Sequence, residues 1–133
     1  MANARVGSHP SFGGTVVVNS TSSFTLDPSD SGKRFILKGA AVTVTLPTLS
    51  TKIAGFEITL ISGDTNNHVL SGGASKIYGY AFNQSTTTAA AHCTALSGAS
   101  SATLGSGAIG DIFQISSDGT NWYVQIMANA AVS

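Results

Sequence analysis

The chain is 133 residues long, which is enough for one domain with a core of its own. Only 9% of its residues are charged, and six basic residues balance six acidic ones. Because binding to phosphate groups is largely electrostatic, this composition argues against nucleic acid or an anionic membrane as a partner.

The polar residues are mostly Ser, Thr, Asn and Gly, whereas 42% of the chain is hydrophobic. Such an uncharged surface creates little repulsion between copies, so we expect much of it to lie against other protein subunits. No stretch approaches the roughly 20 apolar residues that span a bilayer. The first fourteen residues contain no apolar run that fits a signal peptide, and the lone Cys93 fits folding in a reducing cytoplasm.

Residues 1–14 are predicted to form an extended N-terminal arm, ahead of a β domain over residues 15–127. The arm places Arg5, His9 and Phe12 among small residues. It is the first candidate for contact with a partner, and a frayed terminus is the competing interpretation. Residues 128–133 are predicted to be a C-terminal tail.

Short runs of β-branched and aromatic residues follow one another along the domain, separated by Gly, Ser, Asp and Pro. No window of helical length has an apolar stripe at a spacing of about 3.6 residues. The sequence therefore predicts an all-β fold, a single-domain β-sandwich or jelly roll of roughly seven to ten short antiparallel strands. The predicted strands lie in residues 15–19, 23–26, 34–38, 42–46, 56–61, 68–70, 76–80 and 111–127.

Residues 83–107 differ from the rest of the chain, because they carry no charge and consist largely of Ala, Ser, Thr and Gly. We predict a long loop or insert that contacts a partner, since the stretch lacks the charge and proline that keep chains unfolded. A mobile loop is the competing interpretation. Within it, residues 85–96 allow one or two helical turns, but three consecutive threonines argue against a longer helix.

Two motifs that could carry chemistry fail on their context. Gly105, Gly107 and Gly110 have the spacing of a dinucleotide-binding loop, but an alternating, strand-like segment follows them instead of a helix. His92 and Cys93 are adjacent, so in a strand they point to opposite faces and cannot form a Cys–His pair.

The remaining titratable residues also lack the spacing of a site. The histidines are far apart in the sequence, and each is expected to be solvated or at the edge of the core. Most acidic residues stand beside turn residues, where Asp commonly bonds its own backbone. We therefore predict no catalytic residue, no cofactor and no metal ion. The residues considered are His9, His68, His92, Asp27, Asp30, Asp64 and Asp118.

The segment from residue 110 to residue 127, GDIFQISSDGTNWYVQIM, holds the only tryptophan of the chain. Asp118 and Gly119 fit the two central positions of a type I′ turn, which would close a C-terminal β-hairpin. That register pairs Ile115 with Trp122, Phe113 with Val124 and Gln114 with Tyr123.

In this register one face of the hairpin is apolar, and Trp122 is predicted to be a core anchor rather than an exposed platform. The other face is open to solvent or to a neighbouring subunit. The predicted core residues are Phe113, Ile115, Trp122 and Val124, and the predicted contact residues on the open face are Tyr123 and Gln125.

The order of these pieces resembles small β-rich structural proteins of tailed bacteriophages, which include head decoration (cement) proteins and modules of tail fibres and spikes. The resemblance covers residues 23–124, and its pieces are SSFTLDPSDSGKRFILKGAAVTVTLP, then GFEITLISGDTNNHVLSGG with SKIYG, then GDIFQISSDGTNWYV.

This resemblance implies a non-enzymatic protein that is made in the host cytoplasm and located on the capsid surface of the virion. It implies a homotrimer that binds the major capsid protein and stabilises its lattice. The alternative is a receptor- or glycan-binding module of a tail fibre or spike, with Trp122, Tyr78 or Tyr80 as the exposed aromatic residue. The chain has no long repetitive shaft or coiled coil, which favours the decoration protein.

Overall fold

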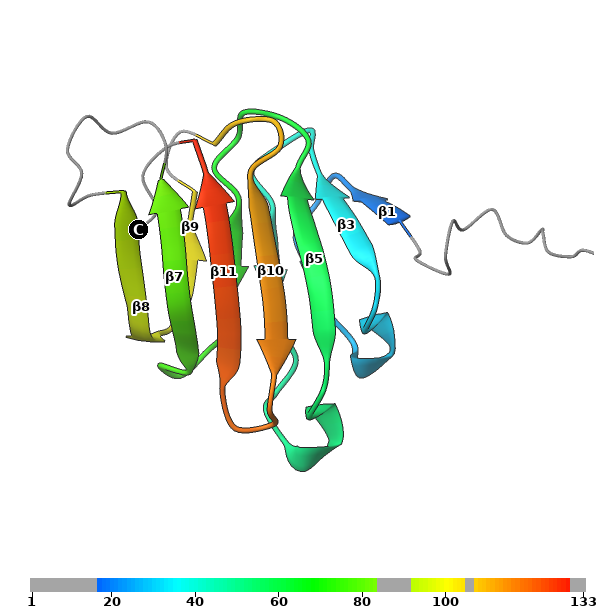
Figure 1. Ribbon diagram of the computed structural model, residues 1–133. Helices are drawn as coiled ribbons and strands as arrows, with labels where there is room; N and C mark the ends of the chain where they lie inside the picture. Colours follow the sequence, from blue (N-terminus) through cyan, green and yellow to red (C-terminus); the bar gives the residue numbers. More distant parts are fainter. Residues whose placement is uncertain (1–16, 84–91, 105–106, 130–133) are drawn as a thin grey trace, which may run out of the picture.

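The computed structural model of the protein describes residues 17–83, 92–104 and 107–129. These residues form two β-sheets that pack face to face, a larger sheet in front and a smaller sheet behind it in Figure 1. Two short 3₁₀ helices, η2 (Pro28–Asp30) and η3 (Thr51–Ile53), lie in the connections. The strands are β1 (Val17–Ser20), β2 (Phe24–Thr25), β3 (Arg34–Leu37), β4 (Thr43–Thr45), β5 (Glu57–Ser62), β6 (Val69–Ser71), β7 (Ile77–Asn83), β8 (Cys93–Ala99), β9 (Ser101–Thr103), β10 (Ile112–Ser117) and β11 (Trp122–Ala128).

The strand order is β1-β3-β5-β10-β11-β7-β8 in the larger sheet and β2-β4-β6-β9 in the smaller one. The chain changes sheet after each strand from β1 to β7, so β1, β3 and β5 run parallel to one another, and so do β2, β4 and β6. Parallel strands need a crossover connection. Here each crossover is a strand of the facing sheet.

The all-β sandwich predicted from the sequence is confirmed, but its strands are not all antiparallel. Five of the nine strand pairings in the described residues are parallel. A jelly roll is built from antiparallel strands, so that alternative is wrong. The physical reason is that the chain alternates between the two sheets. A chain that leaves a sheet, forms one strand in the facing sheet and then returns runs in its original direction, so the two strands of the first sheet are parallel.

Residues 83–107 were predicted to be a loop, and that prediction is wrong for most of the described part. Asn83 ends β7, and β8 and β9 lie within the segment. The Ala, Thr and Ser side chains differ little in hydrophobicity, so alternate positions show no period of two in the sequence. Backbone pairing with β7 and β6 determines these strands instead. The helical turn considered over residues 85–96 falls partly outside the described residues, and residues 93–96 belong to β8.

The core fills the space between the sheets. The four residues predicted for it, Phe113, Ile115, Trp122 and Val124, all lie there with exposed fractions of 3% or less. The Trp122 ring meets the ring of Phe56 edge to face, with centroids 5.6 Å apart and an angle of 84° between the planes. Such a pair adds about 0.5–1.5 kcal/mol to the free energy that burial contributes.

The C-terminal hairpin is present, but its predicted register is wrong by two residues. Ile115 pairs with Val124, and Ser117 pairs with Trp122, so the loop contains residues 118–121. The Asp118 carboxylate accepts the N–H groups of Thr120 and Asn121, both at 2.8 Å, which closes this wider loop. Because side chains alternate with a period of two, the shift leaves each one on its predicted face.

Candidate functional site

The outer face of the larger sheet is the surface that points away from the smaller sheet. Residues in register on neighbouring strands lie side by side on the same face. Three rows of side chains cross this outer face from strand to strand. They are the apolar row (Ile36, Ile61, Ile112, Met127 and Phe82), the amide row (Arg34, Thr59, Gln114, Gln125 and Tyr80) and the tyrosine row (Glu57, Ser116, Tyr123 and Tyr78).

Four neighbouring strands of this sheet, β10, β11, β7 and β8, contain no Asp, Glu, Lys or Arg. Among the described residues, five of the seven exposed large hydrophobic side chains lie on β7 and β11. A single exposed apolar residue is ordinary, whereas a contiguous group marks a contact surface. The five are Tyr78, Tyr80, Phe82, Tyr123 and Met127, and their exposed fractions run from 38% to 62%.

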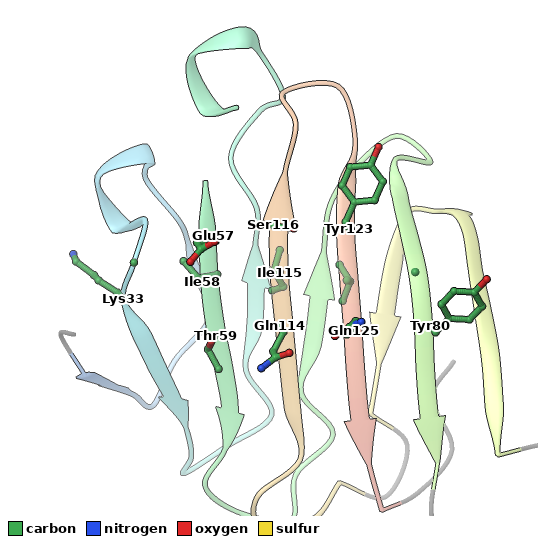
Figure 2. Close-up of a pocket in the computed structure, with 13 residues that line it drawn as sticks. Lys33, Glu57, Ile58, Thr59, Tyr80, Gln114, Ile115, Ser116, Tyr123 and Gln125 are labelled. Atoms are coloured by element: carbon green, nitrogen blue, oxygen red, sulfur yellow. The ribbon is translucent and has the colours of Figure 1, made fainter. Parts of the chain in front are cut away.

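A shallow hollow of about 500 Å³ lies in the middle of this face (Figure 2). Its lining includes Tyr80, Tyr123, Gln114 and Gln125, which project from β7, β10 and β11. Gly79 also lines it, at a φ of 145°. A Cβ at this position would collide with the backbone of Val124, so only glycine allows β7 to pair with β11 here.

Tyr123 is held in place at the edge of the hollow. Its hydroxyl donates to Oδ2 of Asp118 at 2.9 Å. The backbone N–H groups of Asn121 and Thr120, followed by this hydroxyl, hold the pKa of Asp118 below its usual value. Asp118 is therefore ionised near neutral pH, and its charge strengthens the hydrogen bond that fixes the tyrosine ring.

The two glutamines of the amide row lie between Tyr80 and Thr59, and Figure 2 shows the four side chains in line across neighbouring strands. In the part of the chain that the structure describes, no other residue hydrogen-bonds the side chains of Gln114 or Gln125. Each amide offers two N–H donors and a carbonyl acceptor. This row can therefore bind a polar ligand or a partner's backbone.

The structure places two of the predicted contact residues, Tyr123 and Gln125, together on the edge of the hollow. Arg5, His9 and Phe12 lie outside the described residues. The sequence did not identify the apolar row or the glutamine Gln114. One signal for this face was present, because the aromatic residues of β7 alternate with smaller residues in IYGYAF.

His68 is completely buried, so the expectation of a solvated or core-edge histidine is wrong for it. The N–H of Val42 donates to its Nδ1 at 3.2 Å, which assigns the ring proton to Nε2. Nε2 then donates to Oδ1 of Asp64 at 3.0 Å. Both ring nitrogens are engaged inside the protein, and His68 has no free lone pair for proton transfer or for a metal.

Asp64 completes this part-buried link between two turns. Its carboxylate accepts the N–H groups of Asn66 at 2.8 Å and of Gly39 at 2.5 Å. Burial raises the pKa of Asp64, but these two N–H groups and His68 outweigh it and leave the pKa below its ordinary value. The prediction that Asp64 bonds turn backbone is confirmed, and so is the same prediction for Asp27, which accepts the N–H of Ser29.

Within residues 17–83, 92–104 and 107–129, no three His, Cys, Asp or Glu side chains are placed to share a metal ion. In the same ranges no helix has the length and apolar character that a membrane crossing requires. Comparison with known proteins finds no family model that matches the chain and no match among curated proteins. The outer face of the larger sheet is therefore the main basis for a functional proposal.

Proposed function

We propose that this protein is a non-enzymatic structural component of a bacteriophage virion. In this role it is a decoration protein that binds the outside of the head as a homotrimer and links neighbouring major capsid subunits. The observation that carries the proposal is the outer face of the larger sheet, where an unbroken apolar row lies on strands that are almost free of charge. The order of the sequence segments supports the virion as the setting.

The composition of this face fits a surface that becomes buried against protein. The centres of protein interfaces are enriched in aromatic residues and Met, and they are depleted of Lys, Glu and Asp. Phe82 and Met127 at one end of the apolar row are 45% and 62% exposed in the single chain. Burial of such apolar area contributes about 25 cal/mol per Å², so these two residues are the expected anchors of the contact.

Binding would stabilise the head by mass action. A ligand that binds the assembled lattice and not the separated subunits stabilises it by about 2.7 kcal/mol at each site when its concentration is 100 times Kd. A trimer that engages several capsid subunits at once gains further through its high effective concentration. Because few charges take part, salt should weaken this contact little.

The test is the addition of purified protein to heads that lack it. We expect saturable binding and a higher melting temperature of the shell. Heads that bind no protein, or that bind it without a change in melting temperature, would contradict the proposal.

A pair of variants makes this test specific to the face. Met127→Lys puts a charge in the apolar row, and Thr25→Lys puts the same charge on the exposed outer side of the smaller sheet. We expect Met127→Lys to weaken head binding at least tenfold, whereas Thr25→Lys binds as the parent does. Equal binding by the two variants would remove the outer face from the proposal. Light scattering of each free protein shows whether the trimer itself is lost.

A further inference from the structure

We infer that the hollow on the outer face of the larger sheet is a binding site for a neutral saccharide. Tyr80 is the platform for the sugar ring, and Gln114 and Gln125 bind its hydroxyl groups. This function is separate from head binding, which we place on the apolar row.

The geometry of the amide row suits a short oligosaccharide. Tyr80 is 54% exposed and stands in register with Gln125, which is in register with Gln114. Neighbouring strands are about 4.8 Å apart, so the row from Tyr80 to Thr59 spans about 14 Å. The hollow of about 500 Å³ falls within the range of about 300–1,000 Å³ that is usual for ligand sites.

The chemistry of the row matches the two kinds of surface that a sugar presents. A pyranose ring has an apolar C–H face, which packs on an exposed aromatic ring, and a periphery of hydroxyl groups. Primary amides suit those hydroxyls because each offers donors and an acceptor side by side. The side chains of Gln114 and Gln125 make no hydrogen bond with another described residue, so no internal bond has to break when a ligand binds.

Tyr123 supplies a second aromatic ring at the edge of the hollow. Its hydroxyl is bound to Asp118, so the ring is held in one position before a ligand arrives. Side chains that are already ordered lose less conformational entropy on binding. Trp122, the other aromatic residue of the hairpin, is completely buried and takes no part.

The distribution of charge favours a neutral ligand. Lys33 and Glu57 line the hollow on the side of β3 and β5, and their charges have opposite signs. The part between Gln114 and Tyr80 has no charged side chain in its lining. A phosphate or sulfate group would find no concentrated positive charge here. A protein segment is the competing occupant. A hydroxyl-rich ligand fits the hollow better than an apolar protein surface does, because the amides of Gln114 and Gln125 make no hydrogen bond with another described residue.

The full-length protein should be tested first on an array of defined neutral and acidic oligosaccharides. NMR titration to millimolar concentration then follows for the strongest neutral binders. Maltotriose, cellotriose and chitotriose are titrated whatever the array shows. We expect at least one neutral saccharide to shift the side-chain amide signals of Gln114 and Gln125. If none of them shifts these signals, or if only acidic saccharides bind, the inference is wrong.

Variants separate this site from the head contact. We expect Tyr80→Ala and Gln125→Ala to reduce saccharide affinity at least tenfold with an unchanged melting temperature. Phe82→Ala, two residues further along the same strand, is the control, and it should leave saccharide binding intact while it weakens head binding. Equal loss of saccharide binding in Phe82→Ala would overturn the inference. Loss of head binding in Tyr80→Ala, with no saccharide bound by the parent, would make the hollow a protein contact instead.

Discussion

The outer faces of the two sheets differ in one respect that bears on function. Both are poor in charge, but the smaller sheet presents short side chains, most of them with hydroxyl groups, whereas the larger sheet presents Tyr, Phe, Met and Gln. The outward residues of the smaller sheet, placed by strand register and alternation, are Thr25, Thr43, Thr45, Val69, Ser71, Ser101 and Thr103.

Low charge alone therefore does not identify a contact surface in this protein. Thr and Ser side chains carry little apolar area, and their hydroxyl groups are well solvated. The side chains of Tyr80, Phe82 and Met127 expose much larger apolar areas, whose burial yields free energy in proportion. We therefore place the proposed contacts on the larger sheet, and the smaller sheet supports it from behind.

The largest expected effect tests the hydrophobic core that the two sheets share. Trp122→Ala should lower the free energy of unfolding by about 3–5 kcal/mol, because it leaves a cavity where the indole contacted Phe56. Denaturant unfolding measures this change. The matched control is Tyr123→Ala, at the next residue and on the opposite face, which should cost far less. Similar losses in the two variants would mean that the inner and outer faces are wrongly assigned.

A smaller effect is expected where His68 and Asp64 join the connection after β3 to the connection after β5. His68→Phe keeps an aromatic ring but leaves the N–H of Val42 without its acceptor and removes one of the three donors to the carboxylate of Asp64. Loss of a buried hydrogen-bond partner costs about 1–3 kcal/mol. Thermal unfolding should therefore show a lower melting temperature for this variant. An unchanged melting temperature would show that the buried histidine is not needed to hold the turns together.

The dependence of stability on acidic pH is a second test of the link between Asp64 and His68. The pKa of Asp64 is below its ordinary value of 3.8 in the folded protein, so its ionised form favours folding. This contribution is complete above the unfolded pKa and is lost as the pH falls through the lower, folded value. Asp27 and Asp118 have pKa values shifted in the same direction and add to the effect.

We therefore expect the contribution of these three carboxylates to the free energy of unfolding to be constant between pH 7 and about pH 5 and to decrease below about pH 4. Urea unfolding at a series of pH values measures it. Asp64→Asn should be less stable at neutral pH and should lose less on acidification. A variant with the same acid dependence as the parent would show that Asp64 does not contribute.

The smallest effect concerns the outer face alone. Tyr123→Phe removes the hydrogen bond to Asp118 and keeps the ring, so the melting temperature should change little. Saccharide affinity should fall slightly, and less than in Tyr80→Ala, because the ring remains but is held less firmly. A fall as large as that of Tyr80→Ala would show that the hydroxyl of Tyr123 binds the ligand directly.

Local patterns in the sequence were enough to predict the apolar face of the hairpin. Trp122, Val124, Phe113 and Ile115 alternate with polar residues, and a register error of two residues does not change their face. The strands from residue 34 to residue 62 were found for the same reason. Their parallel pairing was not, because it depends on the chain crossing to the facing sheet, which no local pattern records.

For the same reason, the sequence predicted only part of the candidate site. Tyr123 and Gln125 belong to the hairpin, and the sequence placed them on its open face. Tyr80 joins them only because β7 pairs with β11 far along the chain, and Gln114 meets Gln125 only in the true register. His68 was misplaced because its burial depends on the distant N–H of Val42.

The most direct test of the central claim is hydroxyl-radical footprinting of the protein, free and bound to heads, with oxidation of Met127 and Phe82 measured by mass spectrometry. The control residue is Pro28, which is exposed in η2 and lies outside the three rows. If the outer face of the larger sheet contacts the capsid, oxidation of Met127 and Phe82 should fall severalfold on heads while that of Pro28 stays the same. Equal oxidation of Met127 and Phe82 in the free and head-bound states would contradict the account.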